Sequence, residues 1–370
     1  INYYPSNVKE KLNSIILSMA EHHWLFSKNP GHDFTRQHLG KLSFYDTMRL
    51  IISMGKGSTN DEIMDYFDLD PDLIPSQSAF CQRRRQISLS AFEYLFSEFS
   101  SSFLSTTDKF KDHCILACDG CHVVYATNSD IIEDYNKPRL IDYKGYNHMH
   151  LNGFVDVISK AFLDVVIQPG QQPDEREALH SMLDHFTPDD PQKYIITADR
   201  GYESYELLFH CEFKNLGYVF RVKSPSSPKS ILSYYASELP DDLEEFDVTI
   251  KRFFTDKATN IMKSQSDVYR YINPSKNTPH FYELLRKNHS HLYFLQFRVV
   301  KIKTAENTYE YLITNLPFSF TLDDIQECYH WRWGIEISFR YLKHAAGLLY
   351  FHSKSVSYTH LRAHETSAHL

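Results

Sequence analysis

Apolar side chains in the first 110 residues recur every three or four positions, a spacing that predicts α-helices. Phe44, Met48 and Ile51 form one such series, and Ile63 and Phe67 form part of another. We therefore expect residues 1–110 to be a helical N-terminal region.

Two of these helices are expected around a short turn. Ser58 offers an N-cap to the first, and Pro75-Ser76-Gln77 precede the second, SAFCQRRRQISLSAFEYLF. Arg83, Arg84 and Arg85 lie near the start of that second helix. Such a pair is typical of helix-turn-helix modules, so we interpret residues 1–110 as a DNA-binding domain. An ordinary surface helix that carries three arginines is the alternative.

From residue 113 the apolar period changes to two, which predicts strands. The candidates, in chain order, are HCILACDG, CHVVYATN, HLNGFVDVIS, AFLDVVIQPG, YIITAD and YVFRVK. Helices are expected over DEREALHSMLDHF and from Glu203, on either side of YIITAD. This order predicts a mixed α/β sheet. Residues 240–316 are strand-like again, as an all-β block, and a last helix is expected from Leu322 to His344.

The composition is that of a globular protein, with 370 residues of which 42% are hydrophobic and 23% charged. No apolar run approaches the roughly 18 residues of a membrane span, and the chain does not open on a signal peptide. Six cysteines in so long a chain do not form a disulfide framework. We therefore expect a cytoplasmic protein that makes no membrane contact.

Charge is distributed unevenly. The net charge of −8 argues against a polyanionic partner, because Lys and Arg supply most phosphate binding. Residues 113–200, however, hold 7 basic and 14 acidic side chains, whereas residues 248–303 hold 11 basic and 3 acidic ones. The acidic segment suits bound cations, and the basic segment suits nucleic acid; a solvated surface is the alternative for both. The basic side chains that we expect to grip DNA phosphates include Lys251, Arg252, Arg298, Lys301 and Lys303.

Two carboxylates stand at predicted strand ends. Asp119 ends the first strand of the sheet and precedes Gly120, and Asp199 ends YIITAD. Carboxylates in such positions leave the core and can meet a ligand. Each could also be an ordinary turn residue, since turns favour Asp.

A third carboxylate lies in the last predicted helix. Tyr329, Arg332, Glu336 and Lys343 are spaced so that all four fall within an arc of about 60° on one helix face. A Glu among a phenol, a guanidinium and an ammonium suits a metal-bound phosphodiester, with Glu on the cation and the bases on phosphates. Intrahelical ion pairs on a surface are the alternative.

These residues carry a family resemblance. ILACDG, TADRGY and the Tyr329-x2-Arg332-x3-Glu336-x6-Lys343 series resemble the three acidic motifs of DDE transposases, specifically bacterial insertion-sequence transposases of family four with their Tyr-Arg-Glu-Lys signature. The resemblance implies an RNase H-like catalytic core in two parts, residues 111–223 and 313–355. Residues 224–312 would form a β-rich insertion between them.

The resemblance also implies an activity and its components. Asp119, Asp199 and Glu336 would be catalytic and would bind two Mg²⁺ ions, for which Mn²⁺ can substitute. The reaction would be metal-dependent cleavage and strand transfer of insertion-sequence ends. Tyr329, Arg332 and Lys343 would contact DNA phosphates. The partners would be double-stranded DNA, as inverted-repeat ends and target, and a second subunit in a homodimer on DNA.

Two other functions stay open. The same metal chemistry would serve an RNase H-like nuclease without strand transfer, and a catalytically silent DNA-binding remnant would keep the fold alone. Other polar motifs are assigned no chemistry. Cys118-x-x-Cys121 lacks a second pair nearby and is interpreted as core or turn, while His148 and His150 are interpreted as ordinary polar positions.

The end of the chain differs from the rest. From Val356 to Thr366 it reads VSYTHLRAHET, which resembles the translation of a transposon-derived sequencing-library adapter. We expect residues 356–370 to be a non-native tail, and the natural sequence to be truncated near Ser355.

Overall fold

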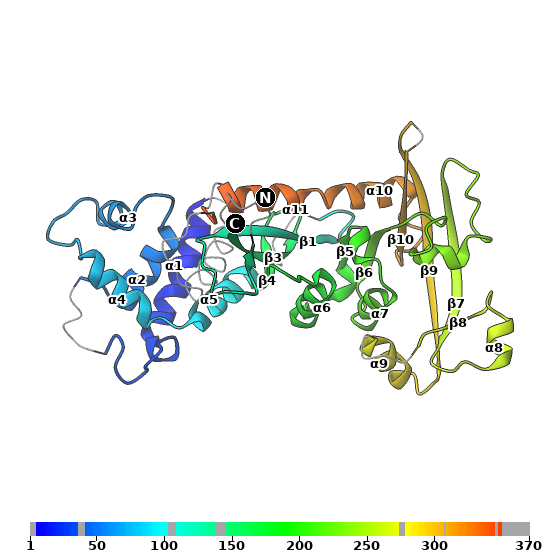
Figure 1. Ribbon diagram of the computed structural model, residues 1–370, viewed down its shortest axis with the longest axis horizontal. Coiled ribbons are helices and arrows are strands. Elements are labelled where there is room, and N and C mark those ends of the chain that lie inside the picture. The colour runs from blue at the N-terminus through cyan, green and yellow to red at the C-terminus, as the bar shows by residue number, and fades with distance from the viewer. Residues whose placement is uncertain are drawn as a thin grey trace.

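The computed structural model describes residues 5–35, 41–102, 109–137, 145–273, 278–306, 308–344 and 347–349. The molecule is elongated, with a helical region at one end and a mixed sheet that runs from the middle to the other end (Figure 1). Within the described residues, no helix is both long and apolar enough to cross a bilayer. The predicted tail, residues 356–370, lies outside the described residues.

The N-terminal region is helical, as predicted. Its elements are α1 (Pro5–Glu21), η1 (His23–Leu25), α2 (Phe44–Ser53), α3 (Thr59–Tyr66), α4 (Gln77–Gln86) and α5 (Leu89–Ser101). Ser43 and Ser58 form capping boxes with Asp46 and Asp61 at the starts of α2 and α3, which satisfy backbone N–H groups there. The helices enclose a core of their own, and α5 packs against strand β4.

The prediction of one long second helix in this pair is wrong, because the helix is interrupted at Ile87 and Ser88. Ile87 has extended backbone and forms a β-bridge with Ser27, and the Ser88 N–H donates to the Phe26 carbonyl at 2.8 Å. Two shorter helices, α4 and α5, replace it. The arginines at 83–85 therefore lie in the last turn of α4 rather than near a helix start.

The sheet has ten strands in the order β2-β3-β1-β5-β6-β10-β9-β7-β8, with β4 paired to β3. Its first strands are β1 (Cys114–Tyr125), β2 (Tyr135–Asn136), β3 (Tyr146–Asp156), β4 (Phe162–Pro169), β5 (Tyr194–Ala198) and β6 (Gly217–Val222). Strands β4, β3 and β1 are antiparallel, and β1, β5 and β6 are parallel. This is the RNase H-like arrangement, so the predicted fold class is confirmed.

Strand β1 differs from its prediction. HCILACDG and CHVVYATN are one strand, because β3 pairs with it without interruption from Leu116 to Tyr125. Asp119 and Gly120 are therefore inside a strand on the β3 side, and no turn separates the two halves.

Helices cover both faces of the sheet (Figure 1). The elements on one face are α6 (Glu175–His185), α7 (Tyr205–Phe213) and α9 (Pro279–Lys287), and those on the other are α10 (Leu322–Trp331) and α11 (Gly334–His344). The period of two in β1 explains this division. Leu116 and Cys118 join the core under α6 and α7, whereas Ile115 and Ala117 join the core under α10 and α11.

The segment 224–312 extends the same sheet, because β10 (Thr308–Thr314) pairs with β6. Its other elements are η4 (Ile231–Tyr235), β7 (Phe246–Thr255), α8 (Asn260–Ser264), β8 (Tyr269–Tyr271), α9 and β9 (Leu292–Ala305). The expected all-β block is thus wrong in part, since α9 buries Phe281, Leu284 and Leu285 at helical spacing.

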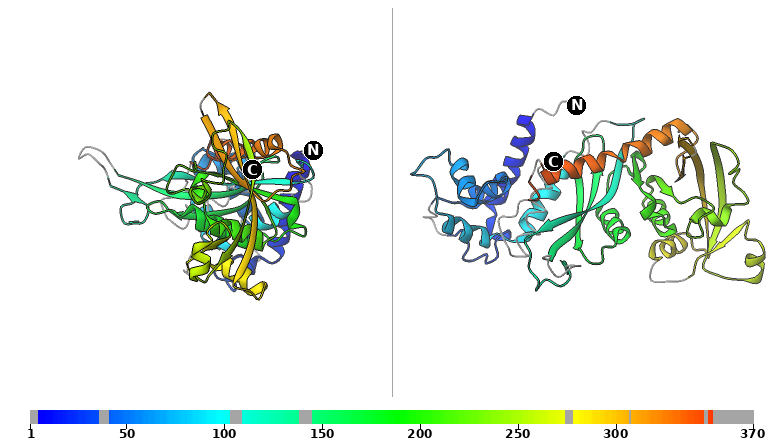
Figure 2. Two further views of the ribbon diagram at one scale, coloured as in Figure 1. Left: turned by 90° about the vertical axis from the view of Figure 1, so that its right-hand side faces the viewer. Right: turned by 45° about the horizontal axis from the view of Figure 1, so that its top comes forward.

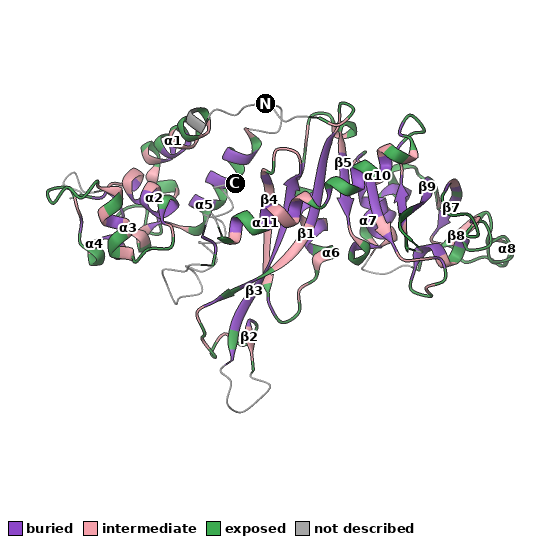
Figure 3. Ribbon diagram, turned by 90° about the horizontal axis from the view of Figure 1, so that it is seen from above, coloured by how far each residue is buried: buried purple, intermediate pink, exposed green. Residues whose placement is uncertain are grey.

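The sheet twists strongly along the molecule. Viewed along the long axis, β9 crosses the direction of β3 (Figure 2). Viewed from above, buried strands fill the centre, while the far end of β3 projects with β2 away from the body (Figure 3). The short 3₁₀ segments η2 (Pro191–Lys193) and η3 (Arg200–Tyr202) flank β5.

Candidate active site

Asp119 and Asp199 lie at one edge of the parallel strands. Strand β5 pairs with β1 only from Cys114 to Ala117, so Asp119 lies just beyond the last residue that β5 covers. Asp199 follows β5 directly. Because parallel strands end at a common edge, the two carboxylates emerge near each other.

Backbone groups orient both carboxylates. The Gly201 N–H donates to Asp199 Oδ1 at 2.7 Å, so Asp199 caps η3. The Gly120 N–H donates to Asp119 Oδ1 at 2.9 Å. Each acid keeps its second oxygen for another partner.

The surroundings of Asp119 disfavour its negative charge. Burial raises the pKa of Asp119 to about 6; the Gly120 N–H and the Arg332 guanidinium oppose this shift, and the carboxylates of Asp199 and Glu175 add to it. A site in which partly buried acids repel one another gains from a bound cation.

The third acid comes from a helical segment that is jointed rather than continuous. Tyr329 lies in α10 and Glu336 in α11, and Arg332 and Trp333 lie between the two helices. At the joint the Arg332 N–H donates to Tyr329 O and the Ile335 N–H donates to Arg332 O, both at 3.1 Å, which is the tighter 3₁₀ pattern. The predicted single stripe is thus split across two helices that follow one another along the sheet.

Arg332 joins the first and third acids. Its Nη1 lies 3.5 Å from Asp119 Oδ2, and its Nη2 lies 3.5 Å from Glu336 Oε1. The Arg332 side chain is buried, whereas Glu336 is partly exposed. The structure therefore brings Asp119 and Glu336 to the two sides of one guanidinium.

The other two signature residues flank this group. Tyr329 is buried, the Arg332 Cζ lies 5.6 Å from its ring centre, and both line a cavity of about 260 Å³ together with Arg221. Burial raises the pKa of Tyr329 above its usual value. Lys343 lies close to Cys121 of β1: burial raises the pKa of that thiol to about 11, and the Lys343 ammonium opposes the shift.

A fourth acid, Glu175, was missed by sequence reasoning. It opens α6, and its Oε1 lies 3.0 Å from Nε2 of buried His150 on β3. A Cβ added at Gly120 would lie 2.2 Å from His150 Nε2 and 2.6 Å from Glu175 Oε1, so only glycine admits this pair beside Asp119. The sequence signal was an acid in a first helical turn, which the helix dipole alone would explain.

Three of the basic residues predicted to grip DNA are buried instead. Arg252 pairs with Glu238, and Lys301 pairs with Asp241 at 3.1 Å. Arg298 pairs with Asp247 and donates to the carbonyls of Leu316, Pro317 and Phe320. Each is at most 5% exposed, so these cations hold loops against the sheet, contrary to expectation.

The two remaining basic residues of that prediction reach the surface. Lys251 is exposed on β7. Lys303 is exposed at the end of β9 but is paired with Glu244 at 2.6 Å. Of the five, Lys251 therefore keeps the position that phosphate binding requires.

The donor set of the site fits a hard divalent cation, because it consists of carboxylate oxygens. Among the described residues, Asp119, Asp199 and Glu336 do not form a group with ligand atoms within 4.8 Å of one another; His180, His210 and His280 do. Arg332 supplies the positive charge between Asp119 and Glu336.

Comparison with known proteins gives a family and structural likenesses. Residues 110–364 match the family described as the transposase DDE domain. No curated protein matches the chain. The cryo-EM structure of a piggyBac transposase synaptic complex with hairpin DNA is similar at a TM-score of 0.44 and 9% identity, over 96% of this chain and 71% of that chain.

Proposed function

Since this chain belongs to the transposase DDE domain family and is a DNA transposase, we propose that it cuts and rejoins the ends of an insertion sequence through Asp119, Asp199 and Glu336. The type proposed is family four, on the strength of its Tyr-Arg-Glu-Lys series. DDE transposase domains use divalent metal ions, and we propose two Mg²⁺ ions here.

Each side chain has a role in this proposal. Asp119, Asp199 and Glu336 hold the ions, which supply activation of the attacking oxygen and stabilisation of the leaving oxygen. Arg332 neutralises Asp119 and Glu336 before DNA arrives and then turns its guanidinium to a phosphate flanking the scissile bond. Tyr329 positions Arg332, and Lys343 binds a second phosphate.

The observation that carries the proposal is the double contact of Arg332. It spans Asp119, near the start of the catalytic core, and Glu336, near its end, each at 3.5 Å. A surface helix with intrahelical ion pairs would not reach a partly buried acid on β1. The contact therefore supports one reaction centre built from both ends of the core.

DNA binding outside this centre is proposed for the helical N-terminal domain and for Lys251 on β7. Arg85 is exposed in the last turn of α4 and Lys251 is exposed on the sheet. Two subunits are proposed to act on paired ends, as the resemblance to family four implies.

The test is nicking of labelled DNA from the sequence that flanks the reading frame, in the presence of Mg²⁺. Alanine at position 119, 199 or 336 should lower the nicking rate by about 10³-fold or more, while a gel-shift assay still shows bound DNA ends. Asp164→Ala is the matched control, because Asp164 lies in the same sheet but pairs with His185. Nicking at the wild-type rate by any of the three variants would contradict the assignment.

A further inference from the structure

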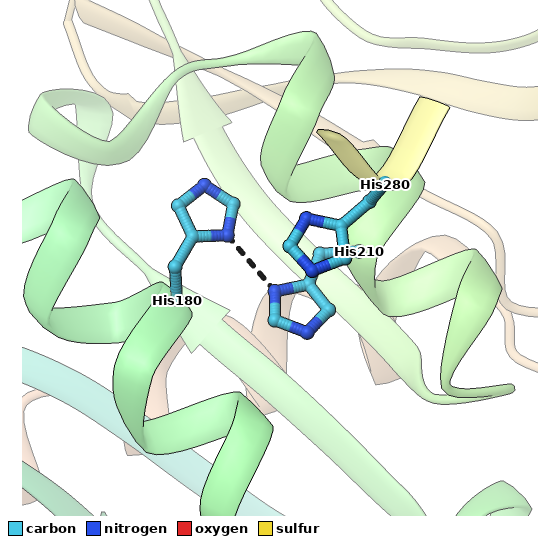
Figure 4. Close-up of side chains that lie close together, drawn as sticks. All are labelled: His180, His210 and His280. Carbon is cyan, nitrogen blue, oxygen red and sulfur yellow. Dashed lines mark hydrogen bonds between the residues drawn. The ribbon is translucent and has the colours of Figure 1, made fainter. Parts of the chain in front are cut away.

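Three imidazoles gather on the face of the sheet that α6, α7 and α9 cover. His180 comes from α6, His210 from α7 and His280 from the first turn of α9 (Figure 4). Their ligand nitrogens all lie within 4.8 Å of one another. The cluster is built from different residues than the proposed catalytic centre.

A carboxylate completes the group. His210 Nδ1 lies 2.9 Å from His180 Nδ1, and His210 Nε2 lies 3.2 Å from Asp184 Oδ1. The same Asp184 oxygen lies 3.8 Å from His280 Nε2. In a tetrahedral zinc site, Zn–N bonds of about 2.0–2.1 Å separate the ligand atoms by about 3.4 Å. The separations of Asp184 Oδ1 from His210 Nε2, 3.2 Å, and from His280 Nε2, 3.8 Å, lie on either side of that value.

The position of the ligands in the helices suits a chelate. His180 and Asp184 are four residues apart in α6, so they share one helix face. Asp184 is 59% exposed, whereas His210 is fully buried. An ion could therefore enter past Asp184 and be enclosed by the imidazoles.

A buried glutamate fixes the tautomer of His280. Glu206 Oε1 accepts from both the backbone N–H and the Nδ1–H of His280, each at 2.7 Å. Nε2 of that ring is then the nitrogen with the lone pair, and it faces Asp184. Carboxylates that hold the far nitrogen of a histidine in this way are typical partners of metal ligands.

One buried nitrogen of the cluster has no hydrogen-bond partner in the part of the chain that the structure describes. His210 Nε2 is buried and makes no hydrogen bond of acceptable geometry within the described residues. Burial lowers the pKa of His210 to about 2 and that of His180 to about 4, and neighbouring imidazoles add to both shifts. Both rings are therefore neutral near pH 7 and offer lone pairs, as metal ligation requires.

We propose that His180, His210, His280 and Asp184 bind one Zn²⁺ ion, and that this ion fastens α9 to α6 and α7. Three imidazoles and one carboxylate are a nitrogen-rich set, which suits Zn²⁺ and excludes Mg²⁺ as the preferred ion. The site is structural, because four protein ligands leave no open position for substrate.

Binding requires the rings to turn. The rings of His210 and His280 stack at 3.6 Å with their planes 12° apart, and the ring of His180 is nearly parallel to both. Lone pairs lie in the ring planes, so rotation about the Cβ–Cγ bonds brings them to a common point.

The consequence concerns the segment 224–312. Helix α9 belongs to that segment, while α6 and α7 belong to the core between β4 and β6. An ion shared by all three helices would hold the segment, and with it Lys251, in one position relative to the catalytic edge. This inference does not depend on the roles proposed for Asp119, Asp199 and Glu336.

The test uses the full chain, freed of any affinity tag and stripped of metal, in an Asp119→Asn/Asp199→Asn background that removes competing carboxylates. We expect one Zn²⁺ per chain by titration calorimetry, a melting temperature that rises with Zn²⁺ but not with Mg²⁺, and a tetrahedral absorption spectrum with Co²⁺. Absence of the Co²⁺ spectrum together with an unchanged melting temperature would overturn the proposal.

Variants locate the ion. His180→Asn should lower Zn²⁺ affinity at least tenfold, and Glu206→Gln should lower it about 10- to 100-fold by releasing His280. His185→Asn is the control: it removes one histidine from the same helix, at a side chain that is 67% exposed and paired with Asp164. Equal affinities for His180→Asn and His185→Asn would show that Zn²⁺ binds elsewhere and would also overturn the proposal. Circular dichroism of each variant confirms that it folds.

Discussion

The guanidinium of Arg332 lies 3.5 Å from a carboxylate oxygen of Asp119, although 213 residues separate the two in the chain. The contact exists because α10 and α11 return along the face of the sheet to which odd-numbered residues of β1 point. The contact links β1, at the start of the catalytic core, to the α10–α11 segment at its end.

Replacing Arg332 tests this contact. Arg332→Met should lower DNA nicking by about 10²- to 10³-fold, the size of effect seen when one transition-state donor is removed. Arg332→Lys should recover only part of the rate, because an ammonium lacks the planar fork that reaches two carboxylates. Arg340→Met, an exposed arginine on α11, is the control and should nick at close to the wild-type rate. Equal nicking rates for Arg332→Met and Arg340→Met would show that Arg332 does not contribute to the reaction.

Glu175 should prove to be a positioning residue. Because it holds His150 next to Gly120, Glu175→Gln should lower the nicking rate about 10- to 100-fold and raise the Mg²⁺ concentration needed for half-maximal rate. Glu177→Gln, an exposed acid in the same helical turn, is the comparison. If Glu175→Gln lowered the nicking rate but left the Mg²⁺ concentration for half-maximal rate unchanged, Glu175 would have a packing role only.

Gly120 should tolerate no side chain. Gly120→Ala would set a Cβ against His150 and Glu175, and we expect it to reduce the free energy of unfolding by about 1–3 kcal/mol and to displace Asp119. Gly31→Ala meets nothing within 4 Å and serves as the control. Urea denaturation of both proteins measures the difference, and equal midpoints would show that the strand adjusts freely.

Asp324 should make stability depend on pH. Hydrogen bonds from Lys111, and then from Thr321, lower the pKa of Asp324, whose side chain completes the capping box with Thr321 at the start of α10. A carboxyl with a lowered folded pKa contributes stability above its unfolded pKa of about 3.9 and loses it as pH falls through the folded pKa. Asp324→Asn should therefore lower the free energy of unfolding at pH 7, and this loss should shrink as pH falls below about 3.9. Asp323→Asn, at its exposed neighbour, is the matched control, and the free energy of unfolding of both variants is measured across this pH range.

Replacing a buried and an exposed basic residue of the 224–312 segment should have different effects, the first on stability and the second on DNA binding. Arg298→Met should lower the free energy of unfolding by about 1–3 kcal/mol, because it leaves the partly buried Asp247 carboxylate and three carbonyls without their partner. Lys251→Met should leave the melting temperature unchanged. It should also reduce the slope of the logarithm of DNA affinity against the logarithm of salt concentration by about one. An unchanged salt slope for Lys251→Met would exclude it from the DNA interface.

Periodic patterns predicted the strands and most helices, because each strand buries alternate side chains and each helix buries one face. The pattern did not predict that β1 runs through Asp119, since Asp-Gly also favours a turn and only pairing with β3 decides between the two. Helix α9 was missed because a nine-residue helix lies among strands of similar apolar content.

The sequence singled out those residues of the candidate site that stand in a recognisable local pattern. Strand ends and helix spacing brought Asp119, Asp199 and the Tyr329–Lys343 series to attention. Glu175 and the three histidines become neighbours only through tertiary packing. Charge counting failed for Arg298, because a count cannot distinguish a guanidinium that faces water from one that faces backbone carbonyls.

The most direct test of the account is strand transfer by the purified chain. Pre-cut DNA ends from the flanks of the reading frame are incubated with Mg²⁺ and a target plasmid, and joined products are quantified for the wild type and for Glu336→Gln. We predict joined products from the wild type and a loss of at least about 10³-fold in the variant, with end binding retained. Hydrolysis of the ends without joining, or equal joining by both proteins, would contradict the account.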